Sequence, residues 1–397
     1  MTELPIYLDN HATTRTDPRV VSVMSPFWTE HFGNAGSGQH RFGQMAAEAV
    51  ENARQQLADS WHASADEIHF TSGATEANNL ALKGIFAGNT RGSRGHLIIS
   101  AAEHRAILDP AKRLRRMGVD VTILSVDEFG RVDPLQVADA IRADTKLVSI
   151  IWASNEVGSL NDVTTIGQIC REHGVWFHTD AVQAVGKIPV DLRSLPIDLL
   201  SCSAHKLYGP PGIGALFVRR HPQRVRLTPL LDGGGQEGQL RSGTVPVPLV
   251  VGFGEAVRIA TQEMSAETSR IRGLRDRLWS RLQAACDSLV WNGHPTERLA
   301  GNLNFSVPGV DGTALLAGLT DVAVSSGSAC TSREPEPSHV LRAMGRSDEL
   351  SRASLRIGIG RFNTESEIDA AADHIATVIS RLRTHQRNHT ESRDIHE

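Results

Sequence analysis

Cysteine is scarce in this sequence. Only four occur in 397 residues, at Cys170, Cys202, Cys286 and Cys330, and no two form a Cys-x-x-Cys pair. This low density excludes a disulfide scaffold and is typical of a reducing compartment. The first three lie in apolar, helix-like or strand-like surroundings, and we interpret them as buried structural thiols. Cys330 differs, because it lies in SSGSACTSREPEP, a stretch of small residues and prolines without periodicity.

Long apolar runs and an excess of positive charge are also missing. No run approaches the ~20 apolar residues of a membrane span, and the start, MTELPIYLDNHATT, lacks the charged and apolar regions of a secretory signal. We therefore expect a cytoplasmic protein without a membrane partner. The formal net charge is −4, so no direct nucleic-acid partner is expected. The GxxxxGK[ST] and HExxH patterns are absent too, which argues against a Walker nucleotide site and a metal site.

The hydrophobic pattern of the chain favours a folded α/β enzyme. Hydrophobic residues make up 40% of the sequence and charged residues 22%. Spacings of three and four predict amphipathic helices at Ala46–Leu57 and Ile271–Leu282, and a capping box at Thr364–Glu367 predicts another that reaches Leu382. Runs rich in β-formers predict strands at His96–Ser100, Val119–Val126, Leu147–Ala153, Val175–His178, Asp198–Cys202 and Ile213–Val218. Helical patterns such as Thr164–His173 separate several of them, which predicts a mainly parallel sheet.

The pattern of predicted helices and strands changes after about Thr261. A long charged helix is followed there by strand-like Asn302–Val307 and Ser354–Ile359. We predict a large α/β domain at residues 16–261, a smaller α+β domain at 1–15 and 262–383, and a polar tail at 384–397. The tail is so polar that we expect it to be frayed.

A lysine follows one of the predicted strands. In SCSAHKLYGP the apolar strand ends in small and polar residues and then Lys206. Ligands bind at strand ends in open α/β sheets. A lysine in that place can form a Schiff base with an aldehyde cofactor, of which pyridoxal phosphate is the usual one. The ordinary alternative for any single lysine is a solvated surface position.

Two further segments suit the same cofactor. Asp180 follows the strand VWFHT, where a carboxylate can keep a pyridine nitrogen protonated; a helix cap is the alternative. The turn TSGATEANN joins a strand end to a helix start, and its free N–H groups and hydroxyls suit a phosphate. An ordinary capped helix is the other interpretation of this turn.

A histidine lies at another strand end. Glu103-His104 follows the predicted strand His96–Ser100. A histidine there can stack on a cofactor ring and move protons near neutral pH. The alternative is a structural histidine with satisfied hydrogen bonds.

In their order along the chain, these segments resemble the cysteine desulfurases of the NifS/IscS branch. The matching segments run from about Pro5 to Leu382 and are YLDNHATT, FGNAGS, FTSGATEANNLA, EH at 103–104, SNEVG, HTDAVQAVGK, SAHKLYGPPGIGAL, GGGQEGQLRSGT and SSGSACTS. The last segment separates this branch from relatives with a shorter cysteine loop. The resemblance implies the pyridoxal-phosphate-dependent fold type I of the class V aminotransferases. It also implies conversion of L-cysteine to L-alanine.

The resemblance implies roles around the cofactor ring. Lys206 would form the Schiff base, and Asp180 would pair with the pyridine nitrogen. His104 would lie over the ring and shuttle protons, and Gln183 would meet the ring hydroxyl. Contacts to the phosphate would come from Ala74, Thr75, Ser203, His205 and, in a homodimer, Thr244 of the partner subunit.

The resemblance also assigns the substrate and the sulfur. Asn155, beside the cofactor, and Arg356 would hold the substrate carboxylate, because an arginine fork can pair with both oxygens. Cys330 matches the cysteine that takes the sulfur as a persulfide. Small residues around Cys330 are expected to let that segment move. The sulfur would go to an acceptor protein, such as an iron–sulfur cluster scaffold or a tRNA-thiolation protein.

Several features leave alternatives open. Ser154 and Pro211 stand where many relatives have asparagine and lysine, and the tail lacks the apolar segment with which housekeeping relatives help to dock their scaffold. The acceptor therefore stays open. Another fold type I enzyme, such as an aminotransferase or selenocysteine lyase, would share the cofactor site without needing Cys330. A third alternative is a non-catalytic scaffold. The presence of Cys330 together with Lys206, Asp180 and His104 argues against it.

Overall fold

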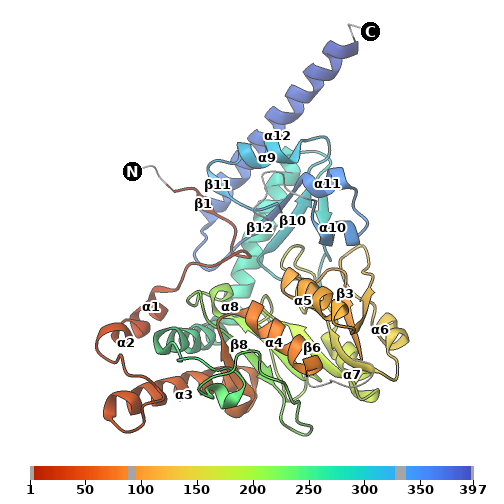
Figure 1. The fold of residues 1–397 in the computed structure, drawn as a ribbon. Coiled ribbons are helices and arrows are strands. Elements are labelled where there is room, and N and C mark those ends of the chain that lie inside the picture. The colour runs from red at the N-terminus through yellow and green to blue at the C-terminus, as the bar shows by residue number, and fades with distance from the viewer. Residues whose placement is uncertain (1–3, 88–94, 327–336, 395–397) are drawn as a thin grey trace.

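The computed structural model describes residues 4–87, 95–326 and 337–394 of the chain (Figure 1). Cys330 lies outside the described residues. Within them, no helix is long and apolar enough to cross a membrane.

A seven-stranded sheet forms the centre of the larger part. Its strands, in spatial order, are β2 (Ile68–Thr71), β8 (Gly214–Val218), β7 (Leu199–Ser203), β6 (Trp176–Asp180), β5 (Thr145–Ser149), β3 (His96–Ser100) and β4 (Asp120–Leu124). Neighbouring strands pair in parallel except where β8 pairs antiparallel with β2 and with β7. All strands but β8 therefore end at the same edge of the sheet. The predicted mainly parallel sheet is confirmed.

Successive side chains of a strand point to opposite faces of the sheet. Both faces are buried here because helices cover each of them. Leu97 and Ile99 of β3 pack with helices α4 (Ala74–Ala87) and α5 (Arg105–Arg116). Ile98, between them, belongs to the cluster on the other face. That cluster is covered by α3 (Arg41–Trp61), α7 (Val163–Glu172) and the first half of α8 (Val247–Ala285). Burying each such aliphatic side chain contributes about 1.5–3 kcal/mol.

A second, antiparallel sheet lies beyond the large one. Its order is β12 (Ser354–Gly358), β10 (Asn302–Ser306) and β9 (Val290–Asn292), and a parallel pair joins β1 (Ile6–Tyr7) to β11 (Val322–Ala323). The second half of α8 and α12 (Glu365–Asp394) pack here in a separate hydrophobic cluster. Leu8 belongs to the same cluster, so the N-terminal arm packs on this part. Helix α8 runs through both clusters, and the exact domain boundaries stay a prediction.

Short helices complete the described chain. The short α-helices are α1 (Pro18–Met24), α2 (Pro26–Thr29), α6 (Pro134–Ala140), α9 (Gly312–Gly318), α10 (His339–Ala343) and α11 (Asp348–Arg352), and the 3-10 turns are Ala65–Glu67, Ala204–Lys206 and Glu237–Gln239.

The polar tail is helical through Asp394, which corrects the expectation that it frays. Figure 1 shows the end of α12 projecting away from the body of the molecule. The packed first half of the helix supplies its nucleus, and propagation from a formed nucleus needs little further stabilisation. Arginine, glutamine and glutamate, which occur in this segment, are good helix formers.

Candidate active site

A cavity of about 520 Å³ opens beside the edge at which the parallel strands end. Among the residues that line it are the predicted site residues Ala74, Thr75, His104, Asn155, Asp180, Gln183, Ser203, His205, Lys206 and Arg356. Thr244 is exposed and does not line this cavity, and Cys330 lies outside the described residues. The structure therefore brings together side chains that are far apart in the sequence.

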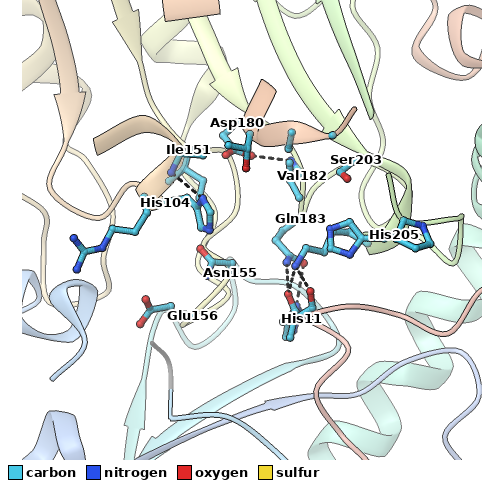
Figure 2. A pocket seen from close by; sticks show the side chains of 18 of the residues that line it. His11, His104, Ile151, Asn155, Glu156, Asp180, Val182, Gln183, Ser203 and His205 are labelled. Carbon is cyan, nitrogen blue, oxygen red and sulfur yellow. Dashed lines mark hydrogen bonds between the residues drawn. The ribbon is translucent and has the colours of Figure 1, made fainter. Parts of the chain in front are cut away.

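The topology explains this convergence. Asp180 is the last residue of β6, and Lys206 lies in the 3-10 turn that follows β7. His104 caps the N-terminus of α5, just beyond β3. Because these strands are parallel, their carboxyl ends present all three side chains to one space. Figure 2 shows Asp180 and His11 on opposite sides of that space, with His104 to one side and His205 to the other.

Lys206 is held at the wall of the cavity rather than in solvent. Its Nζ donates to the backbone carbonyl of His11 at 2.7 Å and to that of Ala12. Burial lowers the pKa of Lys206 to about 8, and the positive charge of Arg356 acts in the same direction. A lower pKa leaves more of the amine neutral near physiological pH, which suits attack on an aldehyde.

Asp180 is a buried carboxylate, only 4% exposed. Its Oδ2 accepts from Nδ2 of Asn78 at 2.7 Å and its Oδ1 from the backbone N–H of Val182 at 3.1 Å. The residues after Asp180 form turns and no α-helix begins there, so the side chain is not a helix cap. Carboxylate oxygens accept more than one bond each, so Asp180 can still receive a charged N–H from the cavity.

The predicted phosphate site lies at the N-terminus of α4. The first N–H groups of a helix have no partner within it, and those of Ala74 and Thr75 border the cavity. Glu76 accepts from the backbone N–H of Ser72 at 2.8 Å, so this turn is capped as well as open toward the cavity. Ser203 also lines this space. Backbone donors at a helix start, with a hydroxyl nearby, suit a phosphate dianion.

His205 lines the same cavity. Its Nδ1 lies 3.0 Å from Oγ1 of Thr13. Burial lowers the pKa of His205 to about 4, and the charges of Lys206 and Lys187 act in the same direction. As a neutral ring, His205 therefore offers a phosphate a hydrogen bond rather than a full positive charge.

Arg356 provides a buried positive charge at the cavity. It is 2% exposed, and its Nη2 donates to Oδ1 of Asp9 at 2.9 Å. Its Nη1 reaches the backbone carbonyl of Asn155 at 3.4 Å, while its Nε has no hydrogen-bond partner among the described residues. The guanidinium is therefore fixed by one carboxylate and keeps donor capacity for a second.

Both flanks of the stretch that contains Cys330 are bonded to residues at or next to the candidate site. On one side, Oγ of Ser325 donates to Oδ2 of Asp9 at 2.7 Å. On the other, Ser338 donates to the buried Glu156, and Nε2 of His339, which lines the cavity, lies 2.9 Å from the carbonyl of Glu103.

Sequence reasoning missed several residues of the site. His11 is 3% exposed, and its Nδ1 lies 3.0 Å from Oε1 of Gln183. Asn78 supports Asp180, and Lys187 reaches Gln183. The segments YLDNHATT, TSGATEANN and HTDAVQAVGK contain these residues, but only the tertiary fold brings His11 to Gln183, 172 positions away.

Comparison with known proteins identifies the family of this chain. Residues 6–371 match the family model "Aminotransferase class-V". The cysteine desulfurase IscS of Anaeromyxobacter dehalogenans (strain 2CP-C) is 50% identical over 382 residues, which are 96% of this chain and 94% of that protein. The motif-based resemblance is thereby confirmed.

Solved structures share the fold along almost the whole chain. A NifS-like protein has a TM-score of 0.88 at 35% identity and covers 96% of this chain and 100% of its own. A structure described as "SspA in complex with cysteine" has a TM-score of 0.79 at 35% identity, with coverage of 90% and 100%. The predicted fold type is confirmed by these neighbours.

Proposed function

We propose that this chain, which belongs to the class V aminotransferase family and is a cysteine desulfurase, moves the sulfur of L-cysteine onto its own Cys330 and releases L-alanine. One observation carries the proposal. Lys206, Asp180 and Arg356, which suit an aldehyde, a pyridine nitrogen and a carboxylate, line a single cavity. His339, which follows the Cys330 stretch, lines it too, and Ser325, which precedes that stretch, donates to the Asp9 carboxylate that pairs with Arg356.

The cavity fits pyridoxal phosphate. Asp180 is a buried carboxylate with spare acceptor capacity, and Lys206 is an amine with a lowered pKa, so each suits one end of the pyridine ring. The phosphate would lie against residues Ala74, Thr75, Ser203 and His205, with Thr244 of the partner subunit of a homodimer completing the site. When bound, the cofactor supplies a sink for the electrons left on the substrate's Cα.

His104 is the proposed proton carrier. Its Nδ1 accepts from the backbone N–H of Ala106 at 3.1 Å, which assigns the ring proton of the neutral form to Nε2. Nε2 is then the nitrogen that gives or takes a proton at the cavity. This anchoring of Nδ1 also fixes the ring plane at the start of α5.

Arg356 and Asn155 are the proposed substrate-binding residues. The buried guanidinium would receive the carboxylate of L-cysteine on the donors that Asp9 leaves unused. Because Asp9 holds Nη2 in place, the fork is oriented before the substrate arrives, and less binding energy is lost to ordering it.

The sulfur step balances without an external oxidant or reductant. The Cys330 thiolate attacks the sulfur of the substrate, an S–S bond forms and the Cβ–S bond breaks. The electron pair of the broken bond stays on carbon, which takes up a proton and becomes the methyl group of alanine. A cysteine with pKa ≈ 8.5 is only a few per cent thiolate at pH 7, so we expect activation near Arg356 or the cofactor site.

The acceptor is proposed by chemical class alone. A persulfide is delivered by attack of another thiol, so the partner would be a protein with an accessible cysteine, such as a cluster scaffold or a thiolation protein. A cytoplasmic location is part of the proposal, and the few cysteines of the chain and its need for a reduced Cys330 support it.

Product analysis tests this function against a transaminase. Holoenzyme given L-cysteine and a thiol acceptor should form alanine and acceptor-bound sulfur in equal amounts, with no added keto acid. Turnover that depends on a keto acid and leaves the sulfur on carbon would contradict the proposal. Selenocysteine is tested in parallel, because a selenocysteine lyase would turn over selenocysteine but not L-cysteine.

A further inference from the structure

We propose that Lys187 is a positioning residue of this site: through a hydrogen bond it fixes the side-chain amide of Gln183 so that its NH2 group faces the cofactor's ring hydroxyl. This inference rests on the proposed function, because it takes the cofactor and the role of Gln183 from it. No part of the proposed chemistry uses Lys187 itself.

The ammonium group of Lys187 and the ring of His11 both contact one oxygen of the Gln183 side chain. Nζ of Lys187 donates to Oε1 of Gln183 at 2.5 Å, and Nδ1 of His11 lies 3.0 Å from the same oxygen. On the other side of the amide, Nε2 of Gln183 donates to the backbone carbonyl of His11 at 3.0 Å. The Gln183 amide is therefore bound at both ends. Figure 2 shows the paired dashed lines between Gln183 and His11.

This arrangement allows one orientation of the amide. A backbone carbonyl only accepts, so the carbonyl of His11 must face Nε2, and the protonated form of Lys187, which only donates, faces Oε1. A flipped amide would set two donors against each other at Lys187. His11 must then donate from Nδ1, which leaves Nε2 of its neutral ring as the atom without a hydrogen bond among the described residues.

The fixed NH2 group lies beside the nitrogen that would hold the cofactor. Nζ of Lys206 donates to the same His11 carbonyl, at 2.7 Å, as does Nε2 of Gln183. In pyridoxal phosphate the ring hydroxyl is on the carbon next to the one that carries the aldehyde. A donor adjacent to Lys206 Nζ is thus a donor adjacent to that hydroxyl, and the second hydrogen of Nε2 is available for it.

The surroundings of Lys187 set its pKa. It borders a small cavity of about 40 Å³ together with His11 and Glu267. Burial lowers the pKa of Lys187 to about 7, the charge of Lys206 acts in the same direction, and Cys202 and Glu267 oppose it. A substantial protonated fraction therefore remains at neutral pH, and this charge acts on the ring hydroxyl through Gln183.

Removing Lys187 should change how the bound cofactor titrates. Both the lost charge and the loosened Gln183 donor would disfavour an anionic ring oxygen, so a bound cofactor would lose its proton at a higher pH. We expect the pH midpoint of the cofactor's absorbance to rise by about one unit in Lys187→Met holoenzyme. Lys187→Arg retains the charge and should show less than half of that shift.

The experiment compares these holoenzymes with Lys112→Met, which removes an exposed lysine paired with Asp109. Lys112→Met should keep the wild-type midpoint. Lys187→Gln is the second uncharged variant if the methionine variant does not fold, and thermal unfolding checks both. A midpoint that is unchanged in the folded Lys187 variants, or that moves equally in Lys112→Met, would overturn the inference.

Failure of the proposed function looks different. Lys206→Ala should abolish the absorbance band of the lysine-bound cofactor. If Lys206→Ala kept that band, the proposed function itself would fail. If Lys206→Ala loses it while the Lys187 variants titrate like the wild type, only the role of Lys187 is wrong.

Discussion

Asp9 and Arg356 are joined at 2.9 Å between Oδ1 and Nη2, although 347 positions separate them in the chain. Asp9 also accepts from Ser325 at 2.7 Å through its second oxygen. One carboxylate on the N-terminal arm therefore orients the proposed substrate-binding arginine and holds one flank of the Cys330 stretch. The N-terminal arm therefore belongs to the candidate active site, whose cavity His11 and Ala12 line.

Arg356→Lys should weaken binding of L-cysteine more than it slows turnover. Lysine keeps the charge but cannot pair with both the substrate carboxylate and Asp9 through a planar fork. We expect KM to rise roughly tenfold to hundredfold, which corresponds to about 1.4–2.7 kcal/mol, with a smaller change in kcat. Steady-state kinetics provide the measurement, and Arg277→Lys on the surface is the control. An unchanged KM would remove Arg356 from the substrate site.

Asp180→Asn should impair chemistry while leaving the fold intact. Asparagine has nearly the same shape and can accept from Asn78 or Val182, but it cannot keep a pyridine nitrogen protonated. We expect kcat to fall by a factor on the order of 100 or more, with little change in thermal unfolding. A variant with near wild-type kcat would show that Asp180 has only a structural role.

The pKa of Lys206 predicts the pH dependence of cofactor uptake. The neutral amine attacks the aldehyde, and the neutral fraction grows as pH rises through about 8. The rate at which the apoprotein takes up pyridoxal phosphate should therefore rise with a midpoint near pH 8 and level off above it. Stopped-flow absorbance measures this rate. A midpoint near 10.5, the ordinary value for lysine, would mean that burial does not act on Lys206 as described.

Glu103 should make the stability of the protein depend on pH. Burial raises the pKa of Glu103 well above its ordinary value of 4.5, so its carboxyl group is protonated in the folded state at pH values where the unfolded chain is ionised. Its stabilising contribution is fully present below pH 4.5 and is lost as pH rises through the folded pKa. Thermal unfolding should thus show that wild type loses stability relative to Glu103→Gln from pH 4.5 upward.

The matched control for this measurement is Glu48→Gln, which changes an exposed carboxyl group. Its difference from wild type should stay constant over the same pH range. Parallel pH profiles for wild type and Glu103→Gln would contradict a protonated Glu103.

Local sequence was sufficient for the parts of the site that follow strands. Asp180, His104 and Lys206 each come after a run of β-formers, and parallel strands bring such ends together, so their convergence could be predicted. The two-residue strands β1 and β11 were not predicted, because a pair of residues carries no readable period.

Residues that act through burial escaped prediction. Lys187 is an ordinary lysine in the sequence, and only packing beside Gln183 and His11 makes it part of the site. Asp9 likewise gains its role from Arg356. The helical end of α12 was missed because the packed half of a helix can propagate into a polar segment that would fray alone.

The most direct test of the central claim is to locate the sulfur. Holoenzyme is incubated briefly with ³⁵S-labelled L-cysteine, alkylated, digested and mapped, alongside Cys330→Ala and the matched variant Cys286→Ala. The proposed function predicts label on the Cys330 peptide in wild type and in Cys286→Ala. Cys330→Ala should lose both this label and the delivery of sulfur to the acceptor. Label on another cysteine, or full sulfur delivery by Cys330→Ala, would contradict it.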